Sequence, residues 1–133
     1  MKVALAQINP TVGALSENSR KIEEIIQEYS PKCDLIVFPE MCLTGYCLDE
    51  KLLSNHGFLE ENKRVLMEEI VPASEGIGVI VGFLDFDAER SRPEGGMIRY
   101  NAAAVAQDGQ LLQVVYKRLL PGYRYFDDKR YFT

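Results

Sequence analysis

The pentapeptide Asp34–Phe38 (DLIVF) restricts the possible folds more than any other segment of the chain. Its apolar residues follow one another without polar alternation, which is typical of a strand buried on both faces. Strands of this kind occupy central positions in sheets that have helices packed over them. Ile77–Phe86 (IGVIVGFLDF) is another run of the same type. We therefore expect buried strands within one helix-covered sheet.

A first strand and a first helix are predicted around this run. Lys2–Ile8 alternates and is rich in Val, Ala, Leu and Ile, which indicates a strand that an Asn-Pro pair ends. In the segment SENSRKIEEIIQEYS we expect Ser16 to cap a helix and Pro31 to end it. Four of its apolar residues recur at helical spacing and form one stripe: Ile22, Ile25, Ile26 and Tyr29.

A second helix is predicted over Phe58–Ile70, ended by Val71 and Pro72. The single histidine, His56, is placed in an exposed loop before it. Asp87–Gly96 is polar and is predicted to form a surface loop. The residues of the second helix that we expect to point inward are Leu59, Leu66 and Ile70.

A β-hairpin is predicted next, from Met97–Ala106 and Leu111–Arg118, because the Asp-Gly pair between them is a strong signal for a tight turn. Strand, helix, strand, helix, strand and hairpin in this order describe an α/β layered sheet with mixed strand directions. The last segment, KRLLPGYRYFDDKRYFT, places five of the thirteen aromatic residues between Tyr123 and Phe132. A loop that only connects elements is not so aromatic.

The composition excludes several classes of protein. With 133 residues, 47% of them hydrophobic, the chain can form one domain with a core. A formal charge of −5 without a basic block makes nucleic acid and anionic membranes poor partners. We expect a cytoplasmic protein, because there is no spanning segment or signal peptide and three cysteines make no disulfide framework.

Two charged residues follow predicted strands at positions where ligands collect. Glu40 comes just after the Asp34–Phe38 strand, and Lys117 lies near the end of a hairpin strand. A carboxylate beside a buried strand end needs a partner, and a lysine ammonium is a suitable one. Taken singly, each residue is more simply a solvated surface charge. The pairing therefore depends on a wider pattern.

That pattern is a family resemblance. FPE followed by LTGY, YNAAAV before a DG turn, and YK followed by LLPGYRYFDDKRYF resemble the carbon–nitrogen hydrolase (nitrilase) superfamily. INPTVG, the LTGY segment and the aromatic loop are most similar to the glutaminase domain of glutamine-dependent NAD synthetase. The resemblance covers essentially the whole chain. It implies a four-layer αββα sandwich, of which residues 1–133 are an N-terminal portion and a partial domain.

The resemblance also implies a Glu–Lys–Cys triad that hydrolyses amides through a thioester. By motif, Glu40 resembles the general base and Lys117 the cation that stabilises the tetrahedral oxyanion. A thiol is only weakly ionised near neutral pH, so it needs a base, and a fixed ammonium acts best where water is excluded. Tyr46, Tyr123 and Phe126 match residues that line the glutamine pocket. Taken singly, each is equally compatible with ordinary packing.

Some positions depart from the family. Asp128 stands where Glu is more common and Gly122 where Asn is common. The nucleophilic cysteine is expected beyond Thr133, so residues 1–133 alone should be inactive. Cys42 is two residues from Glu40, but alternation in an extended segment would point the two side chains apart. We expect Cys42 to be a small buried thiol.

A metal site is not predicted. Cys33, Cys42, Cys47 and His56 could supply three sulfurs and one nitrogen to zinc, but only one pair of cysteines has suitable spacing. Neither a P-loop nor a dinucleotide-binding glycine motif is present. We expect no cofactor in this chain, and ATP and magnesium would belong to a separate synthetase domain.

The leading hypothesis is the N-terminal part of a glutamine amidohydrolase that supplies ammonia for ATP-dependent amidation of deamido-NAD to NAD. The alternatives are a stand-alone amidase or nitrilase acting on another small carbon–nitrogen substrate, and a non-catalytic scaffold. The expected ligand is glutamine or another small amide. Half a sandwich leaves a sheet face or a strand edge uncovered, so we expect a homo-oligomer or a complementing C-terminal segment.

Overall fold

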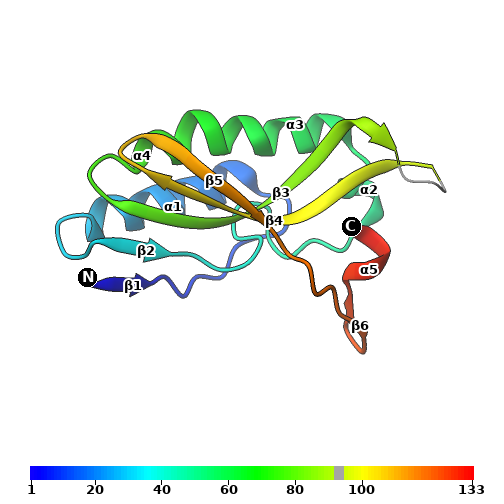
Figure 1. The fold of residues 1–133 in the computed structure, drawn as a ribbon, viewed down its shortest axis with the longest axis horizontal. Helices are drawn as coiled ribbons and strands as arrows, with labels where there is room; N and C mark the ends of the chain where they lie inside the picture. Colours follow the sequence, from blue (N-terminus) through cyan, green and yellow to red (C-terminus); the bar gives the residue numbers. More distant parts are fainter. Residues whose placement is uncertain (92–94) are drawn as a thin grey trace.

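The computed structural model describes residues 1–91 and 95–133, which fold around one five-stranded sheet (Figure 1). The strand order is β1-β2-β3-β4-β5. β1, β2 and β3 are parallel, and β3, β4 and β5 pair antiparallel in turn. The sheet is therefore mixed, as predicted. Its strands are β1 (Val3–Leu5), β2 (Leu35–Val37), β3 (Gly78–Ser91), β4 (Met97–Gln107) and β5 (Gln110–Tyr116).

The buried strand predicted over Asp34–Phe38 is the internal strand β2, although only its middle three residues pair. β1 is likewise shorter than predicted. β3 extends further than predicted and ends at Ser91, because its far end still pairs with β4 across an irregularity. Residues 87–91 of the predicted loop are therefore strand, and residues 92–94 lie outside the described residues.

Two helical segments cover one face of this sheet. The first is α1 (Leu15–Tyr29), and the second runs without a break through α3 (His56–Val65), the π-helix η1 (Leu66–Ile70) and α4 (Val71–Ala73). Among the described residues, no helix is long and apolar enough to cross a membrane. The helices and the sheet share one apolar core, which includes Ile22, Ile26, Ile36, Leu66, Ile70, Val79, Val81, Phe83, Ala102 and Ala104.

The helix ends differ from the sequence expectation. Ser16 does not cap α1, which begins at Leu15 after an N-cap residue without a side-chain hydrogen bond. The second helix begins at His56, where the Asn55 side chain accepts a hydrogen bond from the helix, so His56 is not in a loop. The helical segment also does not end before Val71 and Pro72, because both lie within α4, which ends at Ala73.

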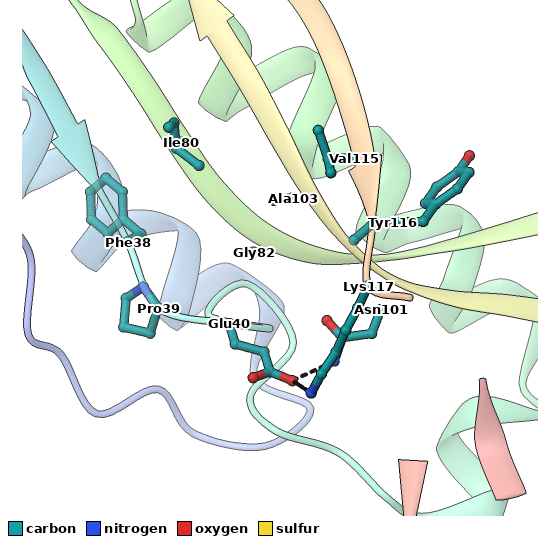
Figure 2. Close-up of a pocket in the computed structure, with 11 residues that line it drawn as sticks. Phe38, Pro39, Glu40, Ile80, Gly82, Asn101, Ala103, Val115, Tyr116 and Lys117 are labelled. Carbon is teal, nitrogen blue, oxygen red and sulfur yellow. Dashed lines mark hydrogen bonds and ion pairs between the residues drawn. The ribbon is translucent and has the colours of Figure 1, made fainter. Parts of the chain in front are cut away.

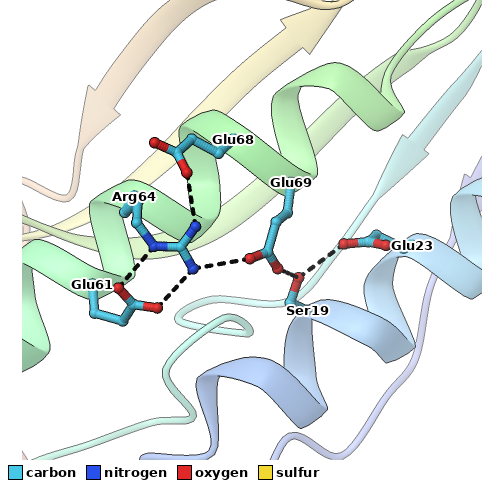
Figure 3. Close-up of polar contacts among 6 residues, drawn as sticks. All are labelled: Ser19, Glu23, Glu61, Arg64, Glu68 and Glu69. Carbon is cyan, nitrogen blue, oxygen red and sulfur yellow. Dashed lines mark hydrogen bonds and ion pairs between the residues drawn. The ribbon is translucent and has the colours of Figure 1, made fainter.

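A polar cluster joins α1 to the second helical segment (Figure 3). The Arg64 guanidinium donates hydrogen bonds to the carboxylates of Glu61, Glu68 and Glu69. The distance from Arg64 to Glu69, which lies on η1, is 3.1 Å. The Ser19 hydroxyl on α1 is buried and donates to Glu69 at 2.7 Å. Arg64 is partly exposed, so its ion pairs add little stability, while Ser19 fixes how η1 sits against α1.

The other face of the sheet carries apolar side chains that no helix of the described residues covers. Leu5, Val37, Ile80 and Val105 share one row across the strands, and Val115 lies in the next row. Leu5 is 80% exposed and Val115 is 49% exposed. The described residues thus form an α/β fold in which one helical layer packs on one face of the five-stranded sheet.

The aromatic C-terminal segment folds at one end of the sheet (Figure 1). It forms β6 (Gly122–Tyr123), β7 (Phe126–Asp127) and α5 (Asp128–Tyr131), close to the short helix α2 (Glu50–Leu53). Tyr131 and Phe132 are buried in a second apolar cluster with β3 and α3 residues. This cluster fixes α5 against the sheet: Met41, Cys47, Leu53, Leu59, Leu84, Phe86, Tyr131 and Phe132.

Candidate active site

Glu40 lies on the loop that follows β2 and crosses over β3 at Gly82. The Leu43 N–H donates to the Gly82 carbonyl at 3.1 Å. A Cβ at Gly82 would lie 2.3 Å from the Met41 nitrogen, so only glycine allows this approach. Met41, directly after Glu40, has a φ of 50°, in the left-handed region that non-glycine residues rarely adopt. Such backbone strain is concentrated at functional sites.

Lys117 is the first residue beyond β5, and its ammonium reaches Glu40, 77 positions away (Figure 2). Lys117 Nζ lies 2.7 Å from Glu40 Oε1 and 2.8 Å from Asp128 Oδ2. Burial alone would lower the pKa of Lys117, but its bonds to Asp128 and Glu40 outweigh burial and raise that pKa. The structure therefore brings the two predicted residues together around a stable ammonium.

Two buried residues complete this group, and sequence reasoning had not assigned either to it. Asp128 is fully buried at the start of α5 and accepts hydrogen bonds from Tyr46 and Lys117. Asn101 on β4 is buried and donates from Nδ2 to Glu40 Oε1. Asn101 lies in YNAAAV and Asp128 in LLPGYRYFDDKRYF, but nothing local in the sequence indicates where their side chains point.

The three predicted aromatic residues gather beside Asp128. The Phe126 ring meets Tyr46 edge-on at 6.4 Å and Tyr123 at 5.9 Å between centroids. Burial, followed by the hydrogen bond to Asp128, raises the pKa of Tyr46, so its phenol stays a neutral donor. Tyr123 is 66% and Phe126 43% exposed, so the described residues leave this aromatic wall open on one side.

A cavity of about 320 Å³ lies in front of Glu40 and Lys117 (Figure 2). It opens on the uncovered face of the sheet, and its remaining lining is mainly apolar. A small apolar hollow with a few convergent polar groups is a typical ligand site. The lining also includes Phe38, Pro39, Ile80, Gly82, Asn101, Ala102, Ala103, Val115 and Tyr116.

None of the three cysteines lines this cavity. Cys42 is fully buried, and burial raises the pKa of its thiol to about 12, so a thiolate is strongly disfavoured. This agrees with the expectation of a small buried thiol. Within residues 1–91 and 95–133, no group of three or more His, Cys, Asp or Glu side chains is arranged to hold a metal ion.

Comparison with known proteins decides the family. Residues 2–132 match the family model for carbon–nitrogen hydrolases. The chain belongs to the carbon–nitrogen hydrolase family. This confirms the resemblance based on the FPE, YNAAAV and YK motifs, and it places the chain in a family of enzymes.

Curated relatives in this family are glutamine-dependent NAD(+) synthetases. The chain is 39% identical to the one from Thermotoga maritima over 99% of its own length and 22% of the relative's. It is 37% identical to one from Xylella fastidiosa strain Temecula1, over 99% of the chain and 23% of the relative. The chain therefore spans less than a quarter of the length of these carbon–nitrogen hydrolase relatives.

Solved structures agree. The glutamine-dependent NAD+ synthetase of Acinetobacter baumannii in complex with ADP superposes with a TM-score of 0.81 and 37% identity, over 99% of this chain and 23% of that one. An amidase from Nesterenkonia sp. superposes with a TM-score of 0.76 and 20% identity, over 100% of this chain and 47% of the amidase chain. The second likeness, at this low identity, shows a shared carbon–nitrogen hydrolase fold alone.

Proposed function

We propose that these residues are part of a glutaminase domain that hydrolyses the side-chain amide of glutamine and releases ammonia. In the complete protein, that ammonia would be used for ATP-dependent amidation of deamido-NAD. The observation that carries the proposal is the Lys117 ammonium held 2.7 Å from Glu40 at the mouth of a small cavity. The synthetase relatives, at up to 39% identity, support glutamine over the substrates of the more distant amidases.

Glu40 and Lys117 have different roles in the proposed reaction. Glu40 accepts the proton of a cysteine thiol that lies outside residues 1–133, and the thiolate attacks the amide carbon of glutamine. Lys117 stabilises the negative charge that develops on the amide oxygen. The C–N bond then breaks, and the leaving nitrogen takes the proton from Glu40 and departs as ammonia. Water, deprotonated by Glu40, hydrolyses the thioester and regenerates the thiol.

Tyr46, Tyr123 and Phe126 are proposed to line the glutamine side of the site. Their edge-to-face rings lie next to the buried Asp128 carboxylate, which the Tyr46 hydroxyl bonds. Aromatic walls exclude water, and exclusion of water strengthens the electrostatic effect of Lys117 on the amide oxygen.

The test is glutamate release from glutamine by the natural polypeptide that contains these residues in full. We expect Glu40→Gln to lower kcat by ~10²–10⁴-fold and Lys117→Ala by ~10²–10³-fold, the usual ranges for a general base and an oxyanion donor. Glu24→Gln and Lys32→Ala are matched controls, because both residues make exposed ion pairs on or just after α1. Near wild-type rates in Glu40→Gln or Lys117→Ala would contradict the proposal.

A further inference from the structure

We infer that Asn101 is a positioning residue that orients Glu40 so that one carboxylate oxygen, Oε2, receives the thiol proton. The inference rests on the proposed glutaminase function. Asn101 does not contact the reacting atoms in this account and acts through Glu40.

Asn101 connects the two charged residues through a single central strand. β4 lies between β3 and β5, and Asn101 is buried there. Its carbonyl accepts the Lys117 N–H at 2.9 Å, while its side-chain Nδ2 donates to Glu40 Oε1 (Figure 2). The strand is paired on both sides, so it is a rigid support. One residue therefore sets the backbone of Lys117 and the side chain of Glu40.

The two hydrogen bonds to Glu40 reach the same oxygen. Asn101 Nδ2 and Lys117 Nζ both donate to Oε1, the latter at 2.7 Å. Within the described part of the chain, no hydrogen bond reaches Oε2 of Glu40. A carboxylate has two oxygens that accept protons, and donors on one of them leave the other as the available acceptor. Oε2 is thus the oxygen free to act as the base.

An amide suits this position better than an ionisable side chain. The groups that face Glu40 are the Lys117 ammonium and, around it, the Asp128 carboxylate and the Tyr46 hydroxyl. A neutral NH₂ donor adds no charge to this set and does not compete for the thiol proton. Asn101 therefore fixes the direction of Glu40 without changing the charge balance of the site.

The direct test measures kcat and KM for glutamate release by Asn101→Leu in the natural full polypeptide. A misdirected base should lower kcat by ~10–100-fold and leave KM within about twofold, since substrate contacts remain. Asn62→Leu is the matched control, since Asn62 is also buried but donates to the Leu84 carbonyl.

Asn101→Asp provides a second readout, which does not require that the fold accept a leucine at position 101. The two carboxylates would face each other and share a proton. At low pH a protonated Asp side chain can donate to Oε1, so the activity relative to wild type should be highest there and fall as pH rises. Activity is compared per folded molecule, because a buried Asp carboxylate would also weaken the fold as pH rises. A purely structural role would not give this pH dependence of kcat.

The outcomes separate this inference from the function on which it rests. If wild type releases no glutamate, the proposed function fails, and a double-mutant cycle of Asn101→Leu and Glu40→Gln in unfolding free energy still tests the contact. Coupling between the two substitutions supports the inference, and additivity contradicts it. With an active wild type, a folded Asn101→Leu variant with unchanged kcat would overturn it, as would a loss confined to KM.

Discussion

At the scale of single residues, one cation bridges two carboxylates. Lys117 lies between Glu40 and the fully buried Asp128, within 2.8 Å of each. The pairing of Glu40 with Lys117 could be predicted from their places after strands and from the family motifs. The contribution of Asp128 could not, because its burial depends on how α5 packs against β3. In the sequence, Asp128 is notable only because the family more often has glutamate at this position.

Asp128→Asn keeps the shape of this side chain and removes its charge. We expect the free energy of unfolding to fall by ~1–3 kcal/mol, because buried donors lose a charged acceptor. The pKa of Tyr46, raised first by burial and then by the bond to Asp128, should move back toward its ordinary value. Urea unfolding and an ultraviolet phenol titration measure both effects. The exposed neighbour Asp127→Asn is the control, and equal effects in the two variants would contradict the prediction.

Tyr116 predicts a loss of stability at high pH. Its hydroxyl donates to Asp85 at 2.7 Å. This hydrogen bond is the main cause, and burial the next, that raises the pKa of Tyr116 from 10.0 to about 12. A raised pKa stabilises the folded state below pH 10, and that contribution is lost as pH rises from 10 through about 12.

Tyr116→Phe should therefore be less stable than wild type at neutral pH and show less of this alkaline loss. Urea unfolding at a series of pH values between 8 and 12 measures the difference. The exposed Tyr125→Phe serves as the comparison, and an identical alkaline loss in wild type and Tyr116→Phe would rule out this contribution.

At the scale of elements, periodicity located the helices and strands better than it located their ends. Leu59, Leu66 and Ile70 are buried as predicted, although they lie on an α-helix and a π-helix rather than on one regular helix. Proline usually ends a helix, and the sequence does not show that a π-helix precedes Pro72 and that the helical segment continues to Ala73. The extension of β3 could not be predicted from its polar residues, because it depends on pairing with β4.

The crossing of the Glu40 loop over β3 makes Gly82 a sensitive position. Gly82→Ala would place a methyl group 2.4 Å from the Pro39 carbonyl, so the loop must shift. We expect a loss of ~1–3 kcal/mol in the free energy of unfolding, as for other overpacked sites, and a large loss of glutamate release. Gly57→Ala in α3 is the control, since its methyl group would meet only ordinary contacts. A fully active and stable Gly82→Ala would contradict this account of the loop.

At the scale of the whole molecule, the sheet has one covered and one uncovered face. The order of elements and the mixed α/β sheet could be predicted from the sequence, and the family sandwich predicted an uncovered face or edge. Which residues line that face becomes visible only when the rows of side chains across the strands are aligned. We propose that the other two layers of the family sandwich cover it in the complete domain. Leu5 and Val115 are the exposed apolar residues that this cover would bury.

Residues 1–133 alone should therefore self-associate. Apolar patches of this kind favour association in water, so light scattering after size exclusion should give a mass that rises with concentration. Leu5→Lys with Val115→Lys should lower that mass, and Lys substitutions at the exposed Tyr29 and Met67, on the helices that cover the opposite face, are the control. A monomer at every concentration would count against the uncovered face.

The central claim is that Glu40 and Lys117 act as one catalytic unit, and a kinetic double-mutant cycle tests it most directly. The measurement is kcat/KM for glutamate release by the natural full polypeptide, with Glu40→Gln, Lys117→Ala and both together. Residues that act as a unit are strongly non-additive, so the double variant should be no more than about tenfold slower than the slower single variant. Fully additive losses, or wild-type rates in either single variant, would contradict the claim.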